Sequence, residues 1–241
     1  MDLSVTFSRP YRVRFDEAGA DGCARASSLV RYLQDLAWQH SEAAGFDRAW
    51  YAERGMGWLV RGLELTLLGG ARNGDTLTVT TRIAGWRRMW ARRDSEVLGA
   101  TGTPIARASI DWVLLDTSGR PMRIPAEMQT SVSRAEPFTP IRVDLDAPPD
   151  DAVPHGSLVR AADVDPMGHL NNAAYVDLID DALAAATGRR LGASATVRLV
   201  YLRPALPAMT VAGTIWPTDH GLGYQLTGSG GPEDLLRAII T

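Results

Sequence analysis

The sequence predicts an α+β fold built from two similar halves. Three features of its 241 residues point to this fold: a weak internal repeat, a proline- and acid-rich stretch between the two copies, and one helical pattern among several strand-like patterns in each copy. A long helix packed against antiparallel strands, present twice, is an α+β arrangement.

The repeat becomes visible when the chain is shifted against itself by 146 positions. Between positions 13 and 35, the shift aligns five identical residues: Val13, Arg14, Gly22, Val30 and Asp35 with Val159, Arg160, Gly168, Val176 and Asp181. Chance would give about one or two identities in such a stretch. The two halves are therefore predicted to be sister modules.

The stretch between the copies, residues 133–156, is rich in proline and acidic residues. Proline interrupts a regular helix, so this stretch is predicted to be an extended crossover linker. The predicted organisation is an N-terminal half, residues 1–132, the linker, and a C-terminal half, residues 157–241.

In the N-terminal half, residues 11–15 alternate in polarity as a strand does, and residues 27–44 carry apolar side chains at the spacing of a helix with one buried face. Glycine, asparagine and aspartate turn signals separate the strands expected next, at 58–68, 76–86, 89–98 and 104–116.

The C-terminal half repeats this order. A strand expected at 158–164 precedes a helix at 172–187, which Gly188 ends, and four further strands are expected at 195–202, 209–216, 224–228 and 235–240. The glycine-rich stretches 99–102 and 228–231 are predicted to be hairpin turns and not phosphate-binding loops, because no helix with the required lysine follows.

Composition excludes several classes of function. The 25 basic and 28 acidic residues give a net charge of −3, without the basic excess typical of nucleic-acid binding. The single cysteine, Cys23, forbids an internal disulfide, and the four histidines lack the spacing of metal ligands. No apolar run is long enough for a membrane span. We expect a cytoplasmic protein with neither metal nor cofactor.

A strand, a central helix and a curved antiparallel sheet in tandem copies are typical of a double hotdog fold. In the first half, the segments LQDLAWQHSEAAGF, GWLVRGLELTLLGG and WARRD resemble the acyl-acyl carrier protein thioesterases of plants and bacteria. In the second half, DVDPMGHLNN followed by Tyr175 is similar to their active-site segment. The resemblance implies hydrolysis of acyl thioesters of acyl carrier protein or coenzyme A, with the acyl chain held by the first half and catalysis in the second.

Thioester hydrolysis needs hydrogen-bond donors at the carbonyl oxygen and an acid or base near the reacting atoms. The first amides of a helix are such donors, and Gly168 allows a ligand to approach the backbone closely. Asp165 is the predicted base or nucleophile and His169 its predicted assistant. Asp165 as a turn residue, and Asn171 and Asn172 as helix caps, are the simpler interpretations.

The segment departs from the family pattern in two places. Met167 stands where the family has asparagine in Asp-x-Asn-x-His, and Pro204-Ala205 stand where it has an acidic residue and often a cysteine. The Asp-Pro pair matches other hotdog thioesterases, which act on coenzyme A esters. We therefore predict a reduced site centred on Asp165.

The predicted substrate-binding residues are Met167, Gly168, Asn171, Asn172, Arg92 and Arg93. The two arginines could meet an acidic carrier protein or the phosphates of coenzyme A, although such a cluster is more often a solvated strand face. Trp86, Trp90 and Trp112 are expected to pack in the core or to bound an acyl tunnel.

Two other functions remain open at this point. One is a hotdog dehydratase or hydratase, and the other is a protein that binds acyl thioesters without hydrolysing them. The protein is expected to be a monomer or a homodimer, since a tandem hotdog already contains the pair that single-copy relatives form by association.

Overall fold

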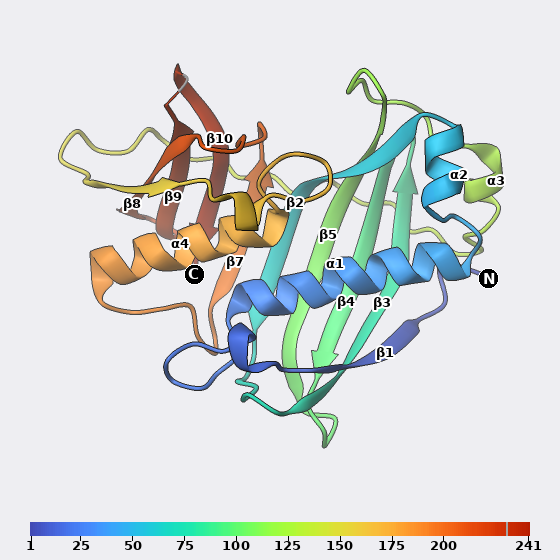
Figure 1. The fold of residues 1–241 in the computed structure, drawn as a ribbon, viewed down its shortest axis with the longest axis horizontal. Helices are drawn as coiled ribbons and strands as arrows, with labels where there is room; N and C mark the ends of the chain where they lie inside the picture. Colours follow the sequence, from blue (N-terminus) through green and yellow to red (C-terminus); the bar gives the residue numbers. More distant parts are fainter. Residues whose placement is uncertain (230) are drawn as a thin grey trace.

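The structure is a computed structural model that describes residues 1–229 and 231–241. The elements of the first half are β1 (Phe7–Arg12), a 3-10 helix (Phe15–Glu17), α1 (Ala26–Ala43), α2 (Arg48–Glu53), β2 (Met56–Leu67), β3 (Thr76–Arg87), β4 (Trp90–Leu98), β5 (Pro104–Asp116) and α3 (Ala126–Gln129). Those of the second half are β6 (Pro154–Leu158), a 3-10 helix (Ala161–Asp163), α4 (Asn172–Thr187), β7 (Thr196–Tyr201), β8 (Thr210–Thr218), β9 (Gly221–Gly228) and β10 (Gly231–Ile240). The predicted α+β class is confirmed (Figure 1).

All strands belong to one antiparallel sheet in the order β1-β3-β4-β5-β2-β7-β10-β9-β8-β6. The two halves join where β2 pairs with β7, with Leu63 opposite Leu199 and Leu65 opposite Val197. An ion pair of 2.6 Å between Glu64 and Arg198 crosses the same junction. The sheet is therefore continuous between the halves.

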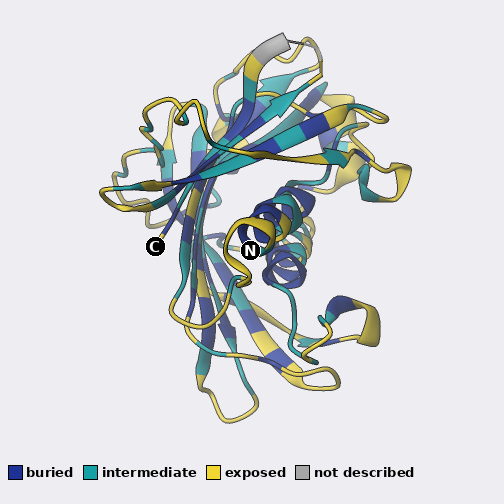
Figure 2. Ribbon diagram, turned by 90° about the vertical axis from the view of Figure 1, so that its left-hand side faces the viewer, coloured by how far each residue is buried: buried dark blue, intermediate teal, exposed yellow. Residues whose placement is uncertain are grey.

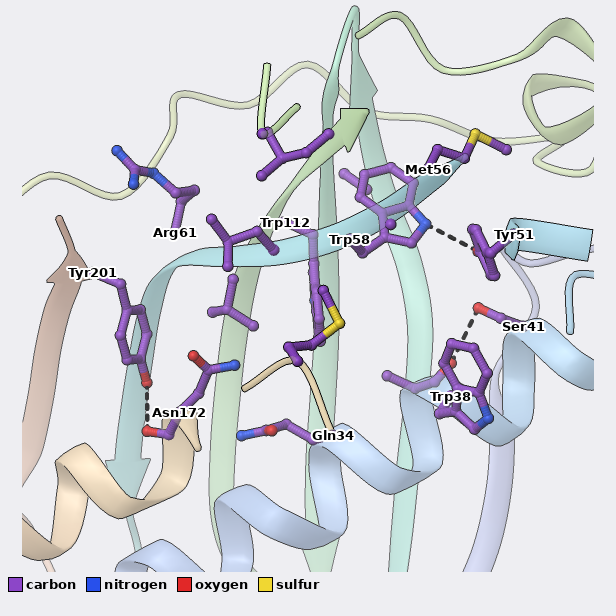
Figure 3. A pocket seen from close by; sticks show the side chains of 18 of the residues that line it. Gln34, Trp38, Ser41, Tyr51, Met56, Trp58, Arg61, Trp112, Asn172 and Tyr201 are labelled. Carbon is purple, nitrogen blue, oxygen red and sulfur yellow. Dashed lines mark hydrogen bonds between the residues drawn. The ribbon is translucent and has the colours of Figure 1, made fainter. Parts of the chain in front are cut away.

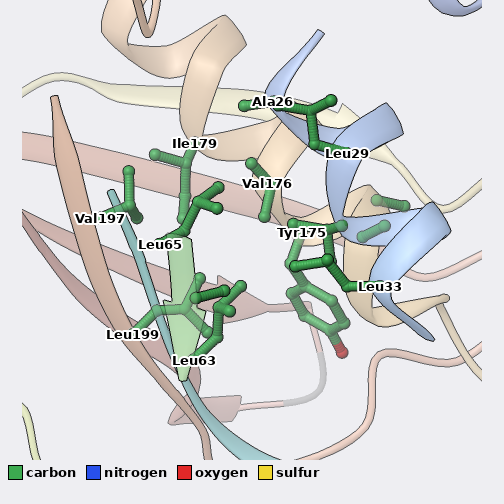
Figure 4. Close-up of a cluster of buried hydrophobic side chains, with 14 of the residues drawn as sticks. Ala26, Leu29, Leu33, Leu63, Leu65, Tyr175, Val176, Ile179, Val197 and Leu199 are labelled. Atoms are coloured by element: carbon green, nitrogen blue, oxygen red, sulfur yellow. The ribbon is translucent and has the colours of Figure 1, made fainter. Parts of the chain in front are cut away.

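The sheet curves around the two long helices, α1 and α4, whose buried sides face it (Figure 2). Around the junction, side chains of both helices pack on β2 and β7, as Leu33, Val176 and Ile179 show beside Leu63 and Leu199 (Figure 4). All five of these side chains are at most 1% exposed. Burial of this apolar surface holds the halves together as one core.

The internal repeat recurs in the backbone at the same shift of 146 positions. The long helices begin at Ala26 and Asn172, and short bridges join Ala18 to Ala24 and Val164 to Leu170. Across the contact between the two helices, Arg31 forms an ion pair of 2.9 Å with Asp177, which is its own counterpart under the shift.

Two predicted strands, at 11–15 and 158–164, are wrong in extent. β1 ends at Arg12 and β6 ends at Leu158, and each is followed by a 3-10 helix. Val13 and Val159 are buried in the core at these points, so the polarity pattern looked strand-like although the chain was already turning. The short helices α2 and α3 were not predicted, whereas the helix predicted at 172–187 has those bounds.

The crossover segment between α3 and β6 contains no helix or strand and lies along the sheet face opposite α1. The Ile141 N–H donates to Asp111 on β5 at 2.6 Å, and the Glu136 N–H donates to the Ala84 carbonyl at 2.9 Å. A Cβ atom at Gly85 would lie 2.4 Å from the Glu136 oxygen, so this close approach requires glycine. Residues 154–156, assigned to the linker from the sequence, begin β6.

The sequence predicts two hairpin turns, at 99–102 and at 228–231. Residues 99–102 turn between β4 and β5, as predicted, with the Gly102 N–H donating to Gly99 at 2.9 Å. The other predicted turn, 228–231, includes Gly230, which lies outside the described residues. In the part of the chain that is described, no helix has the length and apolar character needed to cross a membrane.

Candidate functional site

A cavity of about 790 Å³ lies between α1 and the sheet of the first half and reaches the beginning of α4. Its wall is mostly apolar and comes from α1, α2, strands β2 to β5, the loop before α4 and the segment after β7. Figure 3 shows Asn172 and Tyr201 at one end and Tyr51 and Ser41 at the other. The shape suits a long apolar ligand whose polar end lies beside α4.

The loop before α4 is a tight turn. The Asp165 N–H donates to the His169 carbonyl and the Gly168 N–H to the Asp165 carbonyl, both at 2.9 Å. Gly168 has φ +83°, a left-handed conformation that glycine adopts without a steric penalty. The turn brings residue 165 next to residue 169.

The carboxylate of Asp165 lies close to the imidazole of His169. One oxygen of Asp165, Oδ1, accepts the Met167 N–H at 2.8 Å, and the other, Oδ2, lies 3.6 Å from His169 Nδ1. His169 lines the cavity, whereas Asp165 does not. The carboxylate therefore lies behind the imidazole when viewed from the cavity, and it supports the turn as well.

Two backbone N–H groups at this end lack a hydrogen-bond acceptor in the part of the chain that the structure describes. Of the N–H groups from Gly168 to Ala174, five donate within the described structure, those of Gly168, Leu170, Asn171, Ala173 and Ala174. The N–H groups of His169 and Asn172 have no acceptor among the described residues, and both residues line the cavity. Such amides at a helix start are suited to an anionic oxygen.

The two asparagines have different surroundings. Asn171 is the N-cap of α4, and its side chain accepts the Ala173 N–H at 2.9 Å. The simpler interpretation of Asn171 as a cap is thus confirmed. Asn172 lines the cavity, and its carbonyl oxygen accepts the Tyr201 hydroxyl at 2.9 Å, which fixes the helix start to β7.

The segment after β7 packs against the loop through its backbone. The Ala205 N–H donates to the Tyr175 hydroxyl at 2.8 Å, and the Ala205 carbonyl accepts the Leu170 N–H at 2.9 Å. Burial raises the pKa of Tyr175 to about 12, so its hydroxyl stays protonated. Pro204 and Met167 line the cavity with no titratable group, and Met167 is 67% exposed.

The two predicted arginines lie on opposite faces of β4. Arg92 pairs with Asp111 at 2.7 Å and donates to the Thr139 carbonyl of the crossover segment, away from the cavity. Arg93 lines the cavity and is only 6% exposed. Consecutive residues of a strand point to opposite faces of the sheet, so the side chains of Arg92 and Arg93 lie on different sides of it.

Of the predicted site residues, Met167, His169, Asn172 and Arg93 line the cavity; Asp165, Gly168, Asn171 and Arg92 do not. Trp86 and Trp112 line it as well, which fits the predicted tunnel boundary, but Trp90 does not. Sequence reasoning missed the polar residues Gln34, Ser41 and Tyr51. The first two share a face of α1 with Ala37, and polar side chains on a buried helix face were the available signal.

The first half contains the same loop without the same chemistry. The Gly19 N–H donates to the Cys23 carbonyl at 2.8 Å and the Gly22 N–H to Gly19 at 2.9 Å, which repeats the hydrogen bonds of Asp165 and Gly168. Gly19 and Cys23 occupy the positions of Asp165 and His169. The two loops therefore have the same backbone hydrogen bonds, whereas the carboxylate and the imidazole belong to the loop of the second half.

The arrangement offers an imidazole, unpaired amides and an apolar cavity in one place. Among the described residues, no three His, Cys, Asp or Glu side chains come together as a possible metal site. The family described as acyl-ACP thioesterase N-terminal domain matches residues 4–132, more than half of the chain. The chain belongs to the acyl-ACP thioesterase family.

Curated members of the acyl-ACP thioesterase family are similar over part of their length. An acyl-[acyl-carrier-protein] hydrolase of Cuphea viscosissima is 28% identical over 198 residues, covering 73% of this chain and 46% of the relative. A palmitoyl-acyl carrier protein thioesterase of Gossypium hirsutum is 27% identical with the same coverage. The chain thus spans about half the length of the curated relatives it matches.

Solved acyl-ACP thioesterases share the whole fold. The 12:0-ACP thioesterase of Umbellularia californica superposes with a TM-score of 0.80 at 20% identity, covering 98% of this chain and 97% of its own. An acyl-ACP thioesterase of Bacteroides thetaiotaomicron gives a TM-score of 0.83 at 16% identity, with 98% of both chains covered. These likenesses confirm the predicted double hotdog fold.

Proposed function

We propose that this protein hydrolyses acyl thioesters of acyl carrier protein to the free acid and the carrier thiol. The observation that carries the proposal is the apolar cavity that ends at His169 and at two amides without acceptors. Family membership supports the same reaction. The acyl chain would lie under the sheet of the first half, with its thioester beside the start of α4.

The roles follow from the positions of the groups. His169 faces the cavity and acts as the general base that removes a proton from the attacking water. Asp165, behind it, is the positioning residue: its carboxylate at 3.6 Å and the Leu170 carbonyl at 3.4 Å both favour the proton on Nδ1, and the carboxylate stabilises the imidazolium that forms. This assignment differs from the sequence-based prediction, in which Asp165 itself was the base or nucleophile.

The chemical steps balance without a further reactant. Water attacks the carbonyl carbon while His169 Nε2 takes its proton, and the amides of His169 and Asn172 stabilise the resulting oxyanion. The tetrahedral intermediate then expels the thiolate, which takes the proton from His169. Met167 and Pro204 bring no side-chain acid to this part of the wall, and we therefore assign the proton transfer to the His169 imidazole.

Thiol release from acyl-acyl carrier protein tests the proposal. His169→Gln and Asp165→Asn should each lower kcat about 10²–10⁴-fold, because each disables the same general base. Asp21→Asn is the matched control: Asp21 accepts the Cys23 N–H at 2.9 Å in the equivalent loop of the first half and should leave kcat unchanged.

Other outcomes identify the alternatives. Near wild-type turnover in His169→Gln would contradict the assigned base, and an acyl group found on Asp165 by mass spectrometry would show that the carboxylate attacks directly. Tight binding of the thioester without thiol release would identify a binding protein. Coenzyme A esters of the same acyl chain, measured in parallel, show which carrier is preferred.

A further inference from the structure

The end of the cavity remote from Asn172 contains a buried cation, Arg93, that has no anionic partner among residues 1–229 and 231–241. Arg93 is 6% exposed, and its guanidinium donates to Ser41 Oγ and contacts His40 Nδ1, both at 3.1 Å. No carboxylate of the described residues forms an ion pair with it. A buried charge is costly unless it is paired, so this guanidinium lacks the partner that arginine usually has in a protein interior.

The immediate neighbours of Arg93 do not supply the missing charge. Burial lowers the pKa of His40 to about 4, so at neutral pH the imidazole is uncharged and accepts a hydrogen bond through Nδ1. Ser41 is a neutral hydroxyl, and the Tyr51 hydroxyl, whose pKa burial raises, accepts the Trp58 indole N–H at 3.0 Å. The positive charge therefore faces the cavity uncompensated.

Three further side chains on the cavity wall carry buried hydrogen-bond donors. The indole N–H groups of Trp86 and Trp112 and the amide N–H of Gln34 are buried, have no hydrogen-bond partner in the described structure, and belong to residues that line the cavity. Figure 3 shows Gln34 and Trp112 between the two ends. An unsubstituted alkyl chain has no acceptor for the Arg93 guanidinium, whereas a chain that ends in a carboxylate has one.

We propose that the preferred acyl group carries a carboxylate at its far end, which Arg93 binds while the thioester lies beside His169. The substrate class is thus an ω-carboxyacyl thioester, the half-thioester of a long dicarboxylic acid. A carboxylate matches the planar guanidinium in charge and geometry, and its two oxygens can each accept an N–H. The inference rests on the proposed function for the position of the thioester.

Binding of analogues that cannot be hydrolysed tests this inference separately from catalysis. The probes are pantetheine amides of straight chains of 8 to 16 carbons, ending in a methyl, a hydroxyl or a carboxylate group, titrated by calorimetry. The wild-type protein should bind the best ω-carboxy chain about ten- to a hundredfold more tightly than the methyl-ended chain of the same length. Arg93→Met should abolish this difference and still bind the methyl-ended chain.

Two results would overturn the inference. One is equal or weaker binding of the ω-carboxy chain by the wild-type protein, a comparison that needs no variant and so does not depend on Arg93→Met folding. The other is equally tight binding of the hydroxyl-ended chain, which would remove the role of charge. If the ω-carboxy preference is found but neither thioester releases thiol, the proposed hydrolysis fails and the ligand class stands.

Discussion

The buried carboxylate of Asp111 connects the crossover segment to the sheet, and Asp111→Asn measures that connection. Asp111 is fully buried on β5 and accepts three hydrogen bonds: from Arg92 Nε at 2.7 Å, from Arg92 Nη2 at 2.8 Å and from the Ile141 N–H at 2.6 Å. The substitution removes the negative charge, and the new amide group cannot accept at both positions. Arg92 is then left without a counter-charge.

The size of the effect follows from the burial of the two partners. Removing one partner of a buried ion pair costs about 3–5 kcal/mol. The Arg92 side chain is 19% exposed and can regain some hydration, so we expect a loss of about 2–3 kcal/mol in the free energy of unfolding. With a urea dependence of about 2–3 kcal/mol per molar, the midpoint should fall by about 1 M.

Urea unfolding followed by fluorescence is the assay, with Asp94→Asn as the matched control. Asp94 lies on the neighbouring strand with a side chain that is 40% exposed, 3.6 Å from Arg82. An exposed pair of this kind contributes about 0–1 kcal/mol. Equal midpoints for the two variants would refute the reasoning that burial makes the Asp111 carboxylate important. Faster proteolysis of the crossover segment in Asp111→Asn would support the role of the Ile141 contact.

Three further predictions concern the site and its surroundings. Asn171→Ala removes the cap of α4 and should cost about 1 kcal/mol in thermal unfolding, whereas Asn172→Ala, whose side chain caps nothing, should cost little. Gly168→Ala places a Cβ atom on a residue with φ +83°. It should lower the free energy of unfolding by about 1 kcal/mol and lower kcat by more than this loss of stability explains. An unchanged kcat would contradict the role of the turn. Burial lowers the pKa of His40 to about 4, and the charge of Arg93 adds to the effect. The unfolded chain therefore binds a proton that the folded chain excludes, and stability should fall by about 2 kcal/mol from pH 7 to pH 5, a dependence that His40→Gln should reduce.

Much of the fold could be predicted because periodicity and the repeat carried independent information. The apolar spacing from 172 to 187 and the glycine after it define α4, and the shift of 146 assigned the same role to the helix near residue 26. The strands before the long helices were misplaced for a physical reason. A buried valine, Val13 or Val159, has the same apolar character whether its backbone is extended or entering a 3-10 turn.

The site could be predicted only where it is local in sequence. Asp165, Met167, His169 and Asn172 lie within eight positions of one another, so a single motif contained them. The far end of the cavity combines Ser41 from α1, Tyr51 from α2 and Arg93 from β4, and no spacing along the chain predicts that these meet. Arg92 and Arg93 are consecutive residues of β4, so their side chains point to opposite faces of the sheet. The sequence alone does not show which of the two faces the cavity, because that depends on the register of the strand.

The ion pair between Arg31 and Asp177 shows one consequence of having the two modules in a single chain. In an assembly of two identical copies, a side chain at this place on the twofold axis would face its own duplicate, and like charges would repel. Joining the copies covalently frees the two positions to differ, so opposite charges can meet at 2.9 Å. The two modules therefore differ at the contact between their long helices as well as in the loops before them.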